Sequence, residues 1–203
     1  MKLFKNIKKW LENQEHLFYL FLLILIVPNI ILCFTEPMPV VAKVCNVLLP
    51  FAFYYLLMTL SRNCGKMFWI LFLFIFFGAF QIVLLYLFGQ SIIAVDMFLN
   101  LVTTNSSEAM ELLDNLVPAL VSVIILYIPA LILAAISIIK KRKLSPEFIR
   151  RERKKAWIAL LIGFISLGAA YGLDKRYELK SDLYPANVCY NVCLLYTSDA
   201  ADE

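Results

Sequence analysis

The chain has 203 residues, of which 62% are hydrophobic, and its mean hydropathy is +0.80. A soluble domain of this size does not have enough interior to hide so much apolar surface, so a soluble globular protein is excluded. The apolar residues gather in blocks long enough to cross a bilayer as helices, which takes about 20 residues each. A helix satisfies its own backbone hydrogen bonds without water. We therefore expect an all-α, polytopic membrane protein.

Five segments are predicted to cross the membrane. In chain order they are residues 17–34, 41–60, 67–88, 117–139 and 157–172. Pro28, Pro50 and Pro129 lie inside three of them and are expected to mark kinks. The first segment is not a cleaved signal peptide, because its apolar run is too long and no small-residue cleavage site follows it. Residues 1–172 are thus expected to form one five-helix transmembrane domain.

Basic residues are concentrated in the connections on one side of these segments. The N-terminus carries four lysines, the second connection carries Arg62 and Lys66, and the stretch from Lys140 to Lys155 holds nine basic residues. By contrast, residues 89–117 contain none. The positive-inside rule then predicts a cytoplasmic N-terminus and a C-terminus across the membrane. Anionic lipid headgroups explain a juxtamembrane basic run better than nucleic acid, which is not expected as a partner.

The outer connection between the third and fourth segments changes from apolar to polar along its length. Apolar residues at helical spacing fill its first half, which predicts a helix lying in the headgroup layer. The stretch "NLVTTNSSEAMELLDNL" follows, with amides, hydroxyls and three carboxylates. In one interpretation Asn105 caps a helix and Glu108 completes a capping box. In the other, Asn100, Thr104 and Glu108 recur every four residues and form a polar ridge that suits a zwitterionic lipid headgroup.

These features together resemble a known family. Five spans and an outer helix bearing "FLNLVTTNSSEAMELL" resemble the N-terminal membrane domain of bacterial lipid A phosphoethanolamine transferases, which include the mobile colistin-resistance enzymes. Asn100, Thr104 and Glu108 match the family's pattern, and "LYPANVCYN" resembles its "YP-x-N" segment after the fifth span. In the family those three positions are linked to recognition of the phosphatidylethanolamine donor. The resemblance therefore favours the ridge over the cap.

The resemblance implies a two-step transfer at the bacterial inner membrane, with the C-terminus periplasmic. A threonine nucleophile beside zinc takes phosphoethanolamine from phosphatidylethanolamine and passes it to lipid A or a related envelope glycan. The added cation weakens the attraction of cationic peptides such as polymyxin. In the family the zinc ligands and the nucleophile belong to a soluble domain. No catalytic residue and no cofactor are expected in this chain, zinc being expected in the absent domain, and the chain alone is expected to be inactive.

The residues after the fifth span change in character. Residues 173–193 are predicted to form a periplasmic amphipathic linker, whose tyrosines favour the membrane interface. Residues 194–203, "LLYTSDAADE", are expected to be an artificial read-through tail or a disordered terminus. Cys189 and Cys193 would share one helical face; an outer disulfide and unpaired thiols both stay open.

Two other functional classes stay open from the sequence. One is the membrane anchor of another five-span transferase, such as a lipoteichoic acid synthase type enzyme. The other is a non-enzymatic five-helix membrane protein. The spans contain almost no ionisable residues, which argues against a transporter or a channel. Asn46 and Gln81 are the notable polar residues inside spans, and a hydrogen bond between helices is expected at each.

Overall fold

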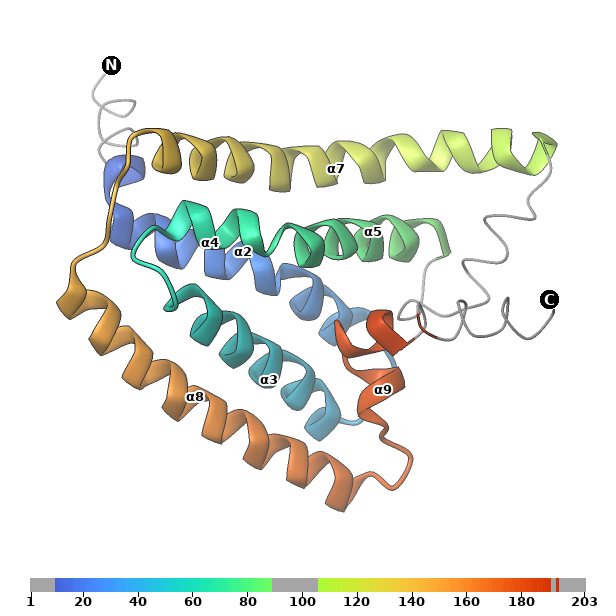
Figure 1. Cartoon of the computed structure of the whole chain (residues 1–203). Helices are drawn as coiled ribbons and strands as arrows, with labels where there is room; N and C mark the ends of the chain where they lie inside the picture. Colours follow the sequence, from blue (N-terminus) through green and yellow to red (C-terminus); the bar gives the residue numbers. More distant parts are fainter. Residues whose placement is uncertain (1–9, 89–105, 191–192, 194–203) are drawn as a thin grey trace.

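The computed structural model of the chain describes residues 10–88, 106–190 and 193, and of residues 86–88 and 106–115 it describes only the backbone (Figure 1). The described chain is helical. Its helices are α2 (Gln14–Thr35), α3 (Val40–Met58), α4 (Cys64–Ile70), α5 (Phe72–Phe88), α7 (Ser106–Ile139), α8 (Pro146–Leu173) and the short α9 (Leu179–Asp182).

Four of these helices are long and apolar enough to cross a membrane: α2, α3, α8 and the Leu116–Ile139 part of α7. Helices α4 and α5 meet at a bend of 62° and make a fifth crossing if the pair counts as one span. The expected class, an all-α protein with several membrane-crossing helices, is therefore confirmed. The predicted outer helix begins within residues 89–105, outside the described residues, whereas its last residues, 106–113, belong to the start of α7.

Three of the predicted spans differ in detail from the structure, one of them the fourth, whose helix α7 begins at Ser106 and not at residue 117. The third span is not one straight helix, because α4 ends at Ile70 and α5 begins at Phe72. The fifth helix begins at Pro146 and so includes much of the basic stretch that was expected to be a connection. It starts there because Ser145 accepts a hydrogen bond from the Phe148 backbone N–H at 3.1 Å, and proline fits the first helical turn.

Successive spans run in opposite directions, so each connection lies at one of the two ends of the bundle (Figure 1). At one end, the Leu144 backbone N–H donates to the Arg62 carbonyl oxygen at 2.7 Å, which joins the α3–α4 and α7–α8 connections. We call this the basic end, because it holds the basic residues of both connections. The opposite end, the linker end, holds the turn between α2 and α3 and the residues that follow α8.

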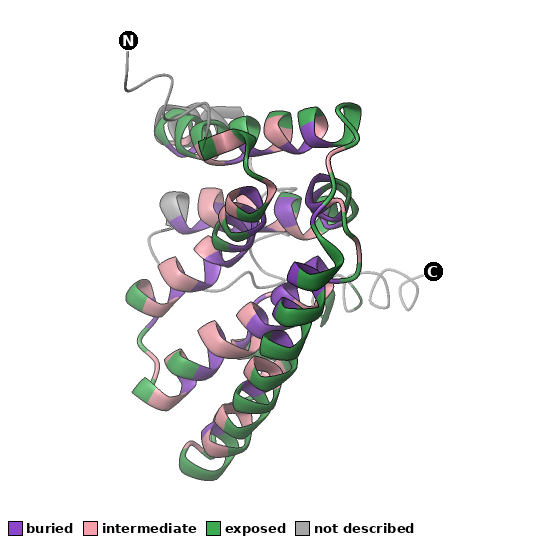
Figure 2. Ribbon diagram, turned by 90° about the vertical axis from the view of Figure 1, so that its left-hand side faces the viewer, coloured by how far each residue is buried: buried purple, intermediate pink, exposed green. Residues whose placement is uncertain are grey.

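The core lies where α2 contacts α3, α4, α5 and α7. Phe18, Phe21 and Phe68 are fully buried there, and the rings of Phe21 and Phe68 stack with centroids 4.4 Å apart. Helix α8 lies at the edge of the bundle and packs on α3. Exposed residues dominate its length, as the lowest helix in Figure 2 shows. In a membrane such an apolar face contacts lipid tails.

Candidate functional site

The structure describes no side chain of the three residues predicted to bind the donor. Asn100, Thr104 and Asn105 are outside the described residues, as is the 194–203 tail. Glu108 lies in the first turn of α7, and of this residue only the backbone is described. The choice between the polar ridge and the helix cap therefore stays a prediction.

Asn46, on α3, is buried at the linker end and uses both ends of its amide group. Its Nδ2 donates to the Asp182 carbonyl oxygen at 2.5 Å and to the Met38 sulfur at 3.3 Å. Its Oδ1 accepts a hydrogen bond from the Tyr177 hydroxyl at 2.8 Å. Asn46 therefore makes the expected hydrogen bond between helices, and its partner lies in α9. Tyr177, which precedes α9, makes a second hydrogen bond to it. Asn46 fixes the position of this segment against the end of the membrane bundle.

Asn29, on α2, extends this arrangement. Its Nδ2 donates to the Asn46 carbonyl oxygen at 2.9 Å and to the Tyr184 carbonyl oxygen at 2.7 Å. The Tyr184 hydroxyl in turn donates to the Phe74 carbonyl oxygen of α5 at 3.2 Å. We call Asn29 and Asn46 the amide clamp. The clamp on α2 and α3, together with the hydrogen bond from Tyr184 to α5, holds the segment that follows the last span on three helices.

The segment after α8 is more buried than the sequence suggests. Its buried residues are Tyr177, Leu183, Tyr184, Asn187 and Val188, whereas Tyr171 and Tyr190 are exposed as expected for interfacial aromatics. Burial raises the pKa of Tyr177 well above its usual range, and the hydrogen bond to the Cys45 sulfur adds to this effect. The phenol therefore stays neutral and donates to Asn46. The predicted linker is in large part docked onto the bundle.

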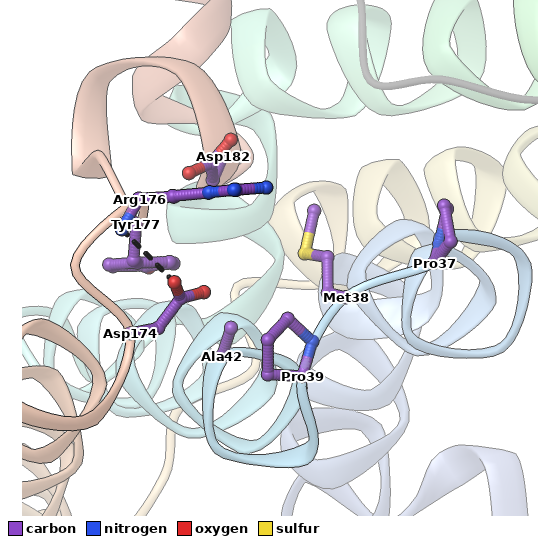
Figure 3. Close-up of a pocket in the computed structure, with 8 residues that line it drawn as sticks. All are labelled: Pro37, Met38, Pro39, Ala42, Asp174, Arg176, Tyr177 and Asp182. Carbon is purple, nitrogen blue, oxygen red and sulfur yellow. Dashed lines mark hydrogen bonds between the residues drawn. The ribbon is translucent and has the colours of Figure 1, made fainter.

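An open pocket of about 530 Å³ lies beside the amide clamp (Figure 3). Its lining residues come from the α2–α3 turn, the first turn of α3 and the segment after α8; they are Pro37, Met38, Pro39, Ala42, Asp174, Arg176, Tyr177 and Asp182. The pocket is thus lined by one guanidinium, that of Arg176, by the carboxylates of Asp174 and Asp182, and by apolar proline, methionine and alanine side chains. This combination suits a small ligand that carries both a negative and a positive charge.

No family model, curated protein or solved structure matches this chain.

The polar groups at the basic end have a different role from those at the linker end. At the basic end, Glu152 of α8 is buried, accepts a hydrogen bond from Tyr55 of α3 and receives Arg151 Nε at 2.8 Å and Lys155 Nζ at 3.0 Å. This group is an anchor between helices, since its buried carboxylate is engaged by Tyr55, Arg151 and Lys155.

The described residues contain no group of three or more His, Cys, Asp or Glu side chains placed to hold a metal ion. Of the cysteines, Cys45 and Cys64 are buried thiols and Cys189 is exposed.

Sequence reasoning singled out Asn46 but missed Asn29 and the charged residues of the pocket. A signal for Asn29 was present, since an amide inside the apolar run "IVPNIIL" needs a partner in a membrane. Asp174, Arg176 and Asp182 gave no such signal, because charges are ordinary in a segment expected to lie in water. Only the folding of that segment over the α2–α3 turn brings them to one pocket.

Proposed function

We propose that this chain is the membrane domain of a phosphoethanolamine transferase. In this role its outer surface binds phosphatidylethanolamine, the donor of a phosphoethanolamine group for lipid A or a related envelope glycan. Catalysis belongs to a soluble, zinc-dependent domain of the complete enzyme. The observation that carries the proposal is the docking of the "YP-x-N" segment, residues Tyr184 to Asn187, on the membrane bundle.

This segment is held much more firmly than a simple tether needs to be. Tyr184 and Asn187 are 1% and 0% exposed, and the amide clamp binds the Tyr184 carbonyl oxygen. A chain that leaves the bundle from such a fixed point starts at a defined place on the membrane surface. Transfer from a lipid requires the donor headgroup and the reacting groups to be held together, because orientation supplies much of the rate.

The distribution of charge supports the orientation that the proposal needs. The basic end contains the nine basic residues between Lys140 and Lys155, and the positive-inside rule assigns such an end to the cytoplasm. The linker end then faces the periplasm, and the first turn of α7, with Glu108, lies toward the same side (Figure 1). Donor recognition and the docked segment would thus share one membrane surface.

The proposal is tested by measuring donor binding to the purified chain in phosphatidylcholine nanodiscs. The probe is phosphatidylethanolamine with a fluorophore on its acyl chain. Replacing Glu108 by alanine removes the carboxylate that pairs with the ammonium, and we expect binding about tenfold weaker, as for loss of one charged hydrogen bond. Asp114→Ala, an equal loss of charge off the predicted ridge, is the matched control and is expected to bind like the unmodified chain.

Two results would contradict the proposal. One is equal binding by the Glu108→Ala variant and the unmodified chain. The other is a preference of the unmodified chain for a lipid without an amine, which would instead favour the anchor of a different five-span transferase, such as a lipoteichoic acid synthase type enzyme.

A further inference from the structure

The pocket at the linker end lies where a lipid headgroup would meet the protein. One wall is the turn between α2 and α3, and the other is the segment that directly follows α8. Both are places where membrane-crossing helices end. The pocket is therefore at the level of the headgroup layer, and its volume of about 530 Å³ is within the usual range for small-ligand sites, roughly 300–1,000 Å³.

Arg176 is placed to receive a ligand. Its side chain extends across the pocket, with Asp182 on one side and Tyr177 and Asp174 on the other (Figure 3). Among the described residues, no hydrogen bond or ion pair engages its guanidinium; its backbone N–H donates to Asp174 Oδ1 at 3.0 Å. A planar guanidinium with unused donors at a membrane surface is well suited to bind phosphate oxygens.

The two carboxylates each have a structural contact and retain the capacity for more. Asp174 Oδ1 accepts from Arg176, and Asp182 Oδ2 accepts from the Glu178 backbone N–H at 2.7 Å. Among the described residues, Asp182 Oδ1 accepts only a long hydrogen bond of 3.4 Å, from the Ser181 hydroxyl. These contacts explain the local turns but do not neutralise the carboxylates. Two negative charges beside one positive charge would attract an ammonium group together with a phosphate.

We propose that this pocket binds the zwitterionic headgroup of an aminated phospholipid. Arg176 contacts the phosphate, Asp174 and Asp182 contact the ammonium, and the apolar surface of Met38 and Ala42 faces the carbon atoms between them. This inference deepens the proposed function, because it gives the donor headgroup a site separate from Asn100, Thr104 and Glu108. It rests on the proposed function for the identity of the lipid as phosphatidylethanolamine.

The test measures fluorescence anisotropy of acyl-chain-labelled phosphatidylethanolamine and phosphatidylglycerol with the full chain in detergent micelles. Arg176→Gln removes the phosphate contact and is expected to weaken binding of phosphatidylethanolamine about fivefold, the upper range for a solvent-exposed charge pair. Asp182→Asn keeps an oxygen that can accept from Glu178 and removes only the charge. We expect it to reduce the preference for phosphatidylethanolamine over phosphatidylglycerol.

Lys175→Gln is the matched control, since this neighbouring residue is exposed and does not line the pocket. It should bind both lipids like the unmodified chain. Thermal unfolding of each variant checks that the fold is kept. Unchanged binding by Arg176→Gln and Asp182→Asn, or an equal loss in Lys175→Gln, would overturn the inference.

Two further measurements distinguish a lipid from a soluble ligand, and the pocket from the site proposed at Glu108. Free phosphoethanolamine carries the same charges without the lipid; if it displaces the labelled lipid at similar concentrations, the pocket belongs to a soluble ligand and the lipid assignment is wrong. The Glu108→Ala variant separates this inference from the proposed function. Loss of binding in Glu108→Ala but not in Arg176→Gln rejects the pocket and keeps the donor ridge, and the opposite pattern rejects the ridge and supports the pocket.

Discussion

Asn46 and Glu152 are buried polar side chains at opposite ends of the bundle, and each ties a later segment of the chain to α3. Asn46 holds Tyr177 and Asp182, whereas Glu152 receives the Tyr55 hydroxyl of α3. A buried polar group without a partner is costly in a membrane interior, so each of these pairings restricts where the later segment can pack. These residues therefore specify the arrangement of the helices in addition to stabilising it.

Replacing Asn46 by alanine should reduce the free energy of unfolding by about 1–3 kcal/mol, because it removes the acceptor for the buried Tyr177 hydroxyl and the donor to Asp182. Unfolding by added SDS in mixed micelles, followed by circular dichroism, measures this change. Lys43→Ala, in the same helix, is the control and should change the free energy by less than about 0.5 kcal/mol. An Asn46→Ala variant as stable as the control would contradict the assigned role.

Replacing Glu152 by glutamine should also destabilise the fold by about 1–3 kcal/mol. Glutamine has the same shape, but it lacks the charge that Arg151 and Lys155 contact. Those two cations are themselves largely exposed, so water can solvate them, and the greater part of the loss comes from weakening the hydrogen bond of Tyr55. The same SDS titration applies. Glu147→Gln, an exposed carboxylate in the first turn of α8, should be nearly neutral, and equal effects of both substitutions would refute this explanation.

At the scale of elements, the closeness of α4 to α7 depends on a glycine. A Cβ atom at Gly65 would collide with the Ala134 carbonyl oxygen and lie 3.0 Å from Ser137 Cβ. Gly65→Ala should therefore separate the two helices and destabilise the bundle by more than about 1 kcal/mol. Gly168 on α8 is a matched control, since a Cβ atom there meets nothing within 4 Å. Gly168→Ala should be neutral or slightly stabilising through helix propensity, and thermal unfolding in detergent compares the two.

The sequence was sufficient to predict the helices but not how they meet. Hydropathy located five apolar segments, because each span must satisfy its backbone alone. The break at Leu71 was not predictable, since neither proline nor glycine marks it. The early start of α8 was readable from Ser145 and Pro146, but the charges that follow suggested a connection. The pairing of Asn46 with Tyr177 joins residues 131 positions apart, and no local pattern encodes such a contact.

The candidate site was likewise predictable from the sequence only in part. A polar amide within an apolar span pointed to Asn46, whereas Arg176 and Asp182 became candidates only through the docking of their segment on the α2–α3 turn. Residues whose role depends on distant packing cannot be found from local spacing. Asn100, Thr104 and Glu108 are the reverse case, because a repeated spacing and a resemblance suggest them while their side chains lie outside the described residues.

At the scale of the whole molecule, the number of membrane crossings depends on the bent pair α4–α5. A bend of 62° is compatible with a broken span or with a re-entrant hairpin. The hydrogen bond between Leu144 and Arg62 places the connections before α4 and after α7 at the same end of the bundle. If α4 and α5 together make one crossing, the chain returns through α7 to the end of the bundle from which α4 started. Counted as one broken span, the bent pair gives five crossings, with the basic end and the linker end on opposite sides.

This topology predicts the accessibility of three exposed lysines, Lys66, Lys143 and Lys175, which lie before α5, after α7 and after α8. In a background whose native cysteines are replaced by alanine, a membrane-impermeant maleimide should label Lys175→Cys in spheroplasts, because the proposed orientation places the linker end in the periplasm. Lys66→Cys and Lys143→Cys should react only in inverted vesicles, because the positive-inside rule keeps the basic end in the cytoplasm. Labelling of Lys66→Cys and Lys143→Cys from opposite sides would mean that the bent pair does not cross. Labelling of Lys175→Cys from the cytoplasmic side would contradict the proposed orientation and would place both proposed donor sites on the cytoplasmic surface.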